Sequence, residues 1–238
     1  RSLKYTISPM DEKEAQDSRI RPVFELVLFF AAFYLVAYLP ADPSLAGAAL
    51  GTASFHLQNL VLLVPRAAFL IYFMARTDGR AAFGLGVPAW GDLPRAAAWA
   101  LGALVVALAS SVALGGQGNA FLEAAGAPSS PPLVLIPLVL ASALAVGYGE
   151  ELFFRCYAIT RLEQAGLAGP WAAIASSLVF GSAHGIQGIR GLVIATILGL
   201  WFSWRWLVDR SLHQIALGHA IYDAVVMLAA IYGPSALG

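Results

Sequence analysis

The chain has 238 residues, of which 59% are hydrophobic and only 12% are charged, and its formal net charge is zero. A soluble globular domain carries about 25% charged residues, so this composition excludes an ordinary soluble protein. The balanced charge gives no indication of nucleic acid as a partner. Composition therefore predicts an integral membrane protein that is surrounded by the lipid bilayer.

A polar segment, 1–22, comes first, and its five basic and four acidic side chains do not fit a cleavable signal peptide. A helix needs roughly 20 apolar residues to cross a bilayer. The rest of the chain contains seven segments of about that length, separated by short stretches rich in Gly and Pro: 23–40, 57–75, 95–114, 132–161, 170–187, 190–208 and 212–232. This pattern predicts an all-α fold, a polytopic transmembrane helical bundle, with one membrane-embedded domain over 23–238.

The basic residues predict the orientation of these spans. With the N-terminus in the cytoplasm, twelve of the 14 lysines and arginines lie on the inner side, against Arg190 outside and Arg66 within a span. Cytoplasmic loops carry such an excess of basic residues. We therefore expect a cytoplasmic segment at 1–22 and a cytoplasmic N-terminus.

Ionisable side chains inside the bilayer cost about 2.5–3.5 kcal/mol on insertion scales and indicate function. Seven residues of this chain qualify: Arg66, Glu150, Glu151, Arg155, His184, His219 and Asp223. Glu151 and Arg155 are four residues apart, and so are His219 and Asp223, so each pair shares one helix face. Counted at about 1.5 Å per residue, the acidic and imidazole groups lie roughly 10–21 Å from the inner boundary, in one layer.

Two carboxylates and two imidazoles in a dry layer favour activation of a water molecule. A carboxylate can take the proton, an imidazole can orient or share it, and hydrogen-bond donors can stabilise an oxyanion. The sequence therefore predicts a hydrolytic site in the inner half of the membrane.

Three motifs carry this site in chain order: Glu150-Glu151-x-x-x-Arg155, Phe180-x-x-x-His184 and His219-x-x-x-Asp223. Together they resemble the signature of the CAAX-protease and bacteriocin-processing (CPBP/ABI) family, which includes the Ras-converting CAAX endopeptidase. The resemblance covers roughly residues 78–232, with the motif-bearing core at about 132–232. It implies a bundle of about eight helices, so we expect seven to eight spans in all.

The resemblance also implies roles for the motif residues. Glu150 and His184 would activate the attacking water, and His219 and Asp223 would stabilise the oxyanion. Glu151 and Arg155 would organise the first motif, with Phe180 in a supporting role. The chain has Asp223 where the Ras-converting members have Asn; an ionised Asp cannot donate a hydrogen bond, so Asp223 either carries a proton or orients His219.

The expected activity is a glutamic-type intramembrane endopeptidase that needs no cofactor and acts on a membrane-associated peptide or protein. The substrate itself stays open among prenylated CAAX tails, bacteriocin leaders, signalling peptides and sorting tags. We expect the chain in the inner membrane of a bacterial cell.

Two alternatives remain. Zinc could be bound by Glu150, His184, His219 and Asp223, although the chain contains no His-Glu-x-x-His pair. The protein could also be a non-catalytic member of the same fold, serving in bacteriocin immunity, as a scaffold or as a transporter. Arg66 has no assigned role; a buried carboxylate such as Glu151, or a carboxylate of the substrate, could pair with it. The single cysteine, Cys156, is expected to be a small buried apolar residue.

Overall fold

The computed structural model describes residues 12–115 and 133–233, and all of its regular elements are helices. Of the predicted cytoplasmic segment, residues 1–11 lie outside the described part, as do residues 116–132 of the connection before the fourth predicted span. The predicted all-α membrane fold is confirmed: six described helices are long and apolar enough to cross a membrane.

The first half of the bundle contains α1 (Glu12–Tyr34), which continues into the 3₁₀-helix η1 (Leu35–Tyr38). A short helix α2 (Pro43–Ala49) leads to the long helix α3 (Ala53–Thr77). The 3₁₀-helix η2 (Arg80–Phe83) then precedes α4 (Asp92–Ala113). Asp42 begins α2 by accepting hydrogen bonds from the Ser44 and Leu45 amides and the Ser44 hydroxyl, which lower the pKa of its carboxyl group.

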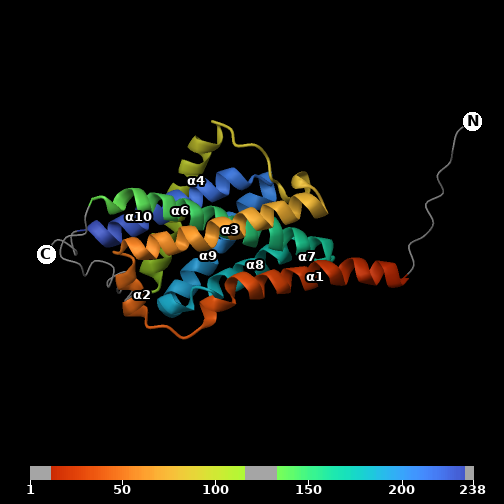
Figure 1. The fold of residues 1–238 in the computed structure, drawn as a ribbon, viewed down its shortest axis with the longest axis horizontal. Coiled ribbons are helices and arrows are strands. Elements are labelled where there is room, and N and C mark those ends of the chain that lie inside the picture. Colours follow the sequence, from red (N-terminus) through yellow and green to blue (C-terminus); the bar gives the residue numbers. More distant parts are fainter. Residues whose placement is uncertain (1–11, 116–132, 234–238) are drawn as a thin grey trace, which may run out of the picture.

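The second half carries the motifs. Helix α6 (Leu135–Glu151), the π-helix η3 (Leu152–Ile159) and α7 (Thr160–Gln164) form one continuous span of 30 residues. They are followed by α8 (Gly169–Ser182), the 3₁₀-helix η4 (Gly185–Gln187), α9 (Gly188–Asp209) and α10 (Leu212–Tyr232). Figure 1 shows α3, α6 and α10 lying lengthwise beside one another, and α10 also packs on α4 while α8 packs on α9.

Among the predicted spans, 170–187 differs most from the helix that the structure shows at that place, α8. Helix α8 has 14 residues, which is about 21 Å, whereas the hydrocarbon core is about 30 Å thick. It is therefore absent from the six candidate spans found among the described residues. His184 consequently lies in the turn between α8 and η4 and not, as the sequence predicted, within a helix.

Ion pairs gather at the end of the bundle where α3, α7 and α9 finish. Arg161 pairs with Glu25 and with Asp78, and Arg210 pairs with Glu163. This is the side that the distribution of basic residues predicts to be cytoplasmic. Glu151 lies ten residues before Arg161 on the same continuous helix, so the motifs lie about 15 Å inside this charged end.

Candidate active site

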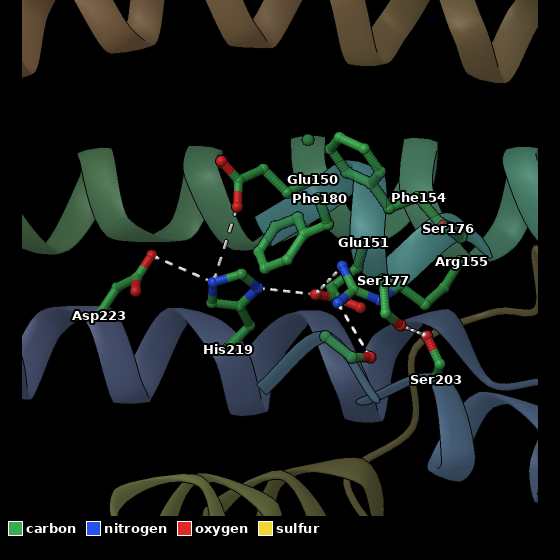
Figure 2. A network of polar contacts seen from close by, with 12 residues as sticks. Glu150, Glu151, Phe154, Arg155, Ser176, Ser177, Phe180, Ser203, His219 and Asp223 are labelled. Atoms are coloured by element: carbon green, nitrogen blue, oxygen red, sulfur yellow. Dashed lines mark hydrogen bonds and ion pairs between the residues drawn. The ribbon is translucent and has the colours of Figure 1, made fainter. Parts of the chain in front are cut away.

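Three carboxylates surround the imidazole of His219, which α10 places against the end of α6 (Figure 2). The Nδ1 atom of His219 lies 2.7 Å from Oε1 of Glu151. Its Nε2 atom lies 3.5 Å from Oδ2 of Asp223 and 3.8 Å from Oε2 of Glu150. Three of the four predicted catalytic residues, Glu150, His219 and Asp223, are thus brought together.

The hydrogen bonds constrain the protons of this cluster. Glu151 is a carboxylate paired with an arginine, so it accepts, and Nδ1 of His219 donates. Nε2 then faces oxygens of both Glu150 and Asp223. A bare lone pair facing two ionised carboxylates would be repelled, so at least one proton is shared among Nε2 and these two side chains.

Glu151 is held from its other side by Arg155. Nη1 of Arg155 lies 3.0 Å from Oε1 of Glu151 without the alignment of a hydrogen bond, and neither side chain is exposed. Nη2 of Arg155 donates to the carbonyl oxygen of Gly199 at 3.2 Å, and its guanidinium lies 4.4 Å from the centre of the Phe180 ring. Arg155 and Glu151 of the first motif therefore form, together with His219 of the third motif, a buried series of polar contacts.

Small residues let α6 and α10 approach closely enough for Glu151 to contact His219. A Cβ atom built on Gly147 would lie 2.6 Å from the carbonyl oxygen of Ala216 and 2.7 Å from the amide nitrogen of Ala220. These two alanines flank His219, and Gly147 lies one turn before Glu151. Only glycine at position 147 permits this separation of the two helices, as is common where membrane helices cross closely.

The π-helix η3 begins directly after the two glutamates, where the sequence predicted an ordinary helix. Such stretches are uncommon and frequently occur at functional sites. Ser176 of α8 donates to the carbonyl oxygen of Phe154 at 2.5 Å, within η3. This side chain ties α8 to the segment that carries Arg155.

Two phenylalanines enclose the imidazole of His219. The Phe202 ring stacks on it with centroids 5.2 Å apart and an interplanar angle of 12°, and the Phe180 ring lies edge-on at 6.1 Å. Phe180 was predicted as a supporting residue. Phe202 was not predicted, because one apolar residue among many on α9 carries no sequence signal that distinguishes it.

The fourth predicted catalytic residue is His184. Its imidazole also contacts the Phe180 ring, with the two ring centroids 4.6 Å apart. Its Nδ1 atom donates to the carbonyl oxygen of Phe180 at 2.8 Å, so Nε2 is the ring nitrogen without this partner. Among the described residues it forms neither a hydrogen bond nor an ion pair with a carboxylate. The structure therefore places His184 near the cluster through Phe180 and does not bring it onto Glu150.

The four residues considered as zinc ligands do not form a ligand set in the described part of the chain, where no group of three or more His, Cys, Asp or Glu side chains is arranged to hold a metal ion. Cys156 is buried, as predicted. Arg66 does not pair with Glu151; it donates to the carbonyl oxygen of Phe33 at 2.8 Å instead.

A comparison with known protein families finds a match to the part of the chain that carries these side chains. Residues 132–225 match the family model described as type II CAAX prenyl endopeptidase Rce1-like. No curated protein and no solved structure matches the chain. The matched range contains all three motifs, so the match agrees with the resemblance that these motifs carry.

Proposed function

We propose that this chain, whose residues 132–225 belong to the Rce1-like family of type II CAAX prenyl endopeptidases, hydrolyses a peptide bond within the membrane with water activated by Glu150. The family supports a protease, and the six apolar helices support a bilayer-embedded site with a membrane-associated substrate. The glutamate chemistry and its independence from a metal ion are the parts that we add.

The carboxylate of Glu150 carries this proposal. Its Oε2 atom is buried and has no hydrogen-bond partner in the described part of the chain. The same atom faces Nε2 of His219 at 3.8 Å, a separation that exceeds a direct hydrogen bond. An acceptor held in this way, on a side chain that retains 18% exposure, suits a general base that removes a proton from water.

We assign His219 and Asp223 to stabilise the negative charge that develops on the carbonyl oxygen of the substrate. With a proton on Nε2, His219 donates a hydrogen bond to the oxyanion, and the Phe202 and Phe180 rings that pack on the imidazole hold it in place. Asp223, 3.5 Å from Nε2, orients the ring or, if it carries the shared proton, donates as well. Glu151 and Arg155 fix the ring from the Nδ1 side.

We assign His184 to help Glu150 activate the attacking water molecule. Its Nδ1 atom donates to the Phe180 carbonyl, and in the neutral form of the ring Nε2 would accept a proton from water. The Phe180 ring contacts both imidazoles, so His184 and His219 lie on either side of one aromatic side chain. In this assignment the two imidazoles bracket the scissile bond, with His184 on the side of the attacking water.

This proposal is tested by comparing the membrane proteins of cells that produce the wild-type chain with those of cells that produce Glu150→Gln. Labelling of new protein termini should reveal one or a few membrane-associated substrates that are cut only in the wild-type cells. Identical termini in the two cell types would instead support a non-catalytic member of the family.

A further inference from the structure

The end of the first helix carries two tyrosines that the proposed chemistry does not use. Tyr34 is the last residue of α1 and Tyr38 is the last of η1, and both lie outside the range 132–225 that matches the family model. The Phe30 ring contacts both of their rings, with centroids 6.2 and 5.9 Å away, so the two tyrosines share one face of this segment. Their hydroxyls form hydrogen bonds with α6 and with α8.

The Tyr34 hydroxyl is bonded to the backbone next to Glu150. It donates to the carbonyl oxygen of Gly149 at 3.3 Å. This carbonyl lies at the junction of α6 and the π-helix η3, where the regular hydrogen bonding of an α-helix changes. The Tyr34 ring also contacts the Phe153 and Phe154 rings of η3, with centroids 4.7 and 4.8 Å away. Tyr34 therefore holds the chain on both sides of Glu150.

The Tyr38 hydroxyl is bonded to the last turn of α8, two residues before His184. Its oxygen lies 2.7 Å from Oγ of Ser182, and Ser182 donates its own proton to the carbonyl oxygen of Val179, also at 2.7 Å. A serine hydroxyl has only one proton, so Tyr38 is the donor in its contact with Ser182. The next element, η4, packs on η1. Tyr38 therefore holds the start of the turn that carries His184.

Glu150 and His184 form no hydrogen bond or ion pair with each other within residues 12–115 and 133–233, yet the proposed mechanism needs both at one water molecule. We propose that Tyr34 and Tyr38 are positioning residues that set the separation of Glu150 from His184. The inference rests on the proposed function and gives α1 a part in the same site. Rates fall steeply when reacting groups are misplaced by about 1 Å, so the two hydroxyls support turnover without contacting the substrate.

A purely structural role would be different, because the hydroxyls would then only fasten α1 to the bundle. Their loss would lower the unfolding temperature and leave the kcat of the folded protein unchanged. Positioning predicts a folded protein that binds its substrate normally and cleaves it slowly. Substitution by Phe keeps both rings, so it removes the hydrogen bonds and little of the packing.

The experiment measures kcat and KM of the full chain in nanodiscs, at equal amounts of folded protein, with an internally quenched peptide that spans the bond cut in cells. The double variant Tyr34→Phe/Tyr38→Phe should lower kcat about ten- to hundredfold and keep KM within about twofold of the wild-type value. Tyr72→Phe is the matched control, because Tyr72 is an exposed tyrosine of α3 whose hydroxyl forms no hydrogen bond in the described part of the chain. An undiminished kcat in the double variant would overturn the inference, as would a loss that is equal in Tyr72→Phe or confined to KM.

Ser182 supplies a second test of the Tyr38 contact. Tyr38→Phe and Ser182→Ala should each lower kcat about three- to tenfold. Their combination should cost little more than either change alone, because both residues act through one hydrogen bond. Ser182→Thr keeps a hydroxyl and should retain most of the wild-type kcat. Losses that multiply in the combined variant would show that the two hydroxyls act separately and would overturn the role of Tyr38.

Hydrogen exchange tests the same contact without a substrate. Tyr38→Phe should raise the exchange of the backbone amides of 183–188, and Tyr72→Phe should not. Unchanged exchange in the Tyr38→Phe protein would overturn the inference. Cleavage by Glu150→Gln at the wild-type rate would contradict the proposed function itself, whereas an inactive Glu150→Gln protein beside a fully active double tyrosine variant would contradict only the positioning role.

Discussion

Glu151 and His219 are 68 positions apart in the sequence, yet Oε1 of the first lies 2.7 Å from Nδ1 of the second. This contact joins α6 to α10 and fixes the imidazole between three carboxylates. Arg155, four residues after Glu151, balances the buried charge. The stability of the protein and the orientation of the groups that we propose for catalysis therefore depend on the same buried series of contacts.

Arg155→Ala should destabilise the protein far more than Glu150→Ala. Removal of Arg155 leaves the fully buried Glu151 carboxylate without its cation, a loss on the order of 3–5 kcal/mol. Glu150 forms no close ion pair and retains some exposure, so its removal has no comparable cost. Thermal unfolding in detergent compares the two variants; equal midpoints would contradict the structural role of Arg155.

Gly147→Ala should lower the unfolding temperature even though alanine is the better helix former by about 1 kcal/mol. The added methyl group meets backbone atoms of Ala216 and Ala220, and overpacking of this kind costs about 1–3 kcal/mol.

Gly149→Ala is the matched control on the same helix. Its methyl group would lie 3.7 Å from the Leu63 side chain, an ordinary contact, so its unfolding temperature should stay the same or rise. A Gly147→Ala protein as stable as Gly149→Ala would show that close approach of α6 and α10 is not required.

His184→Ala should abolish proteolysis without loss of folded protein. Its ring has one hydrogen bond, to the Phe180 carbonyl, so removal leaves the bundle intact while a proton acceptor is lost. The rate should fall by roughly 10²–10⁴. His213→Ala serves as the control, because His213 bonds to Tyr148 and to the Gly86 carbonyl outside the site. A His184→Ala enzyme with near-wild-type rate would remove this residue from the mechanism.

The purified enzyme should keep its activity after exhaustive chelation and should contain substoichiometric zinc. Asp223→Asn should also be tolerated, because Asn can donate to an oxyanion but is a poor metal ligand. A zinc enzyme would need the metal to bring the pKa of its water toward 7. Activity that is lost on chelation and restored by Zn²⁺, together with an inactive Asp223→Asn variant, would establish the zinc alternative.

The helical membrane fold could be predicted because a bilayer demands long apolar segments, and these are visible in the sequence. The match to the family model over residues 132–225 could be predicted because Glu150, His184 and His219 lie in motifs whose spacing is specific. The end of α8 could not be predicted, since this helix is as apolar as its neighbours but stops at 14 residues.

Contacts between helices were harder to predict than the helices themselves. Spacing placed Glu151 and Arg155 on one face, and their ion pair follows from it. It could not show that Glu151, and not Glu150, makes the close contact with His219, because that depends on how α6 and α10 are rotated against each other. Likewise, the partner of Arg66 is a backbone carbonyl, which no side-chain motif reveals.

The central claim is that Glu150 removes the proton from the attacking water, and Glu150→Gln tests it most directly. The substitution keeps the size and polarity of the side chain but removes its basicity. Wild-type and Glu150→Gln proteins, reconstituted in nanodiscs with equal unfolding temperatures, are compared for cleavage of the substrate found in cells. We expect the variant to bind this substrate normally and to cleave it roughly 10²–10⁴ times more slowly or not at all. Cleavage by Glu150→Gln at the wild-type rate would contradict the account.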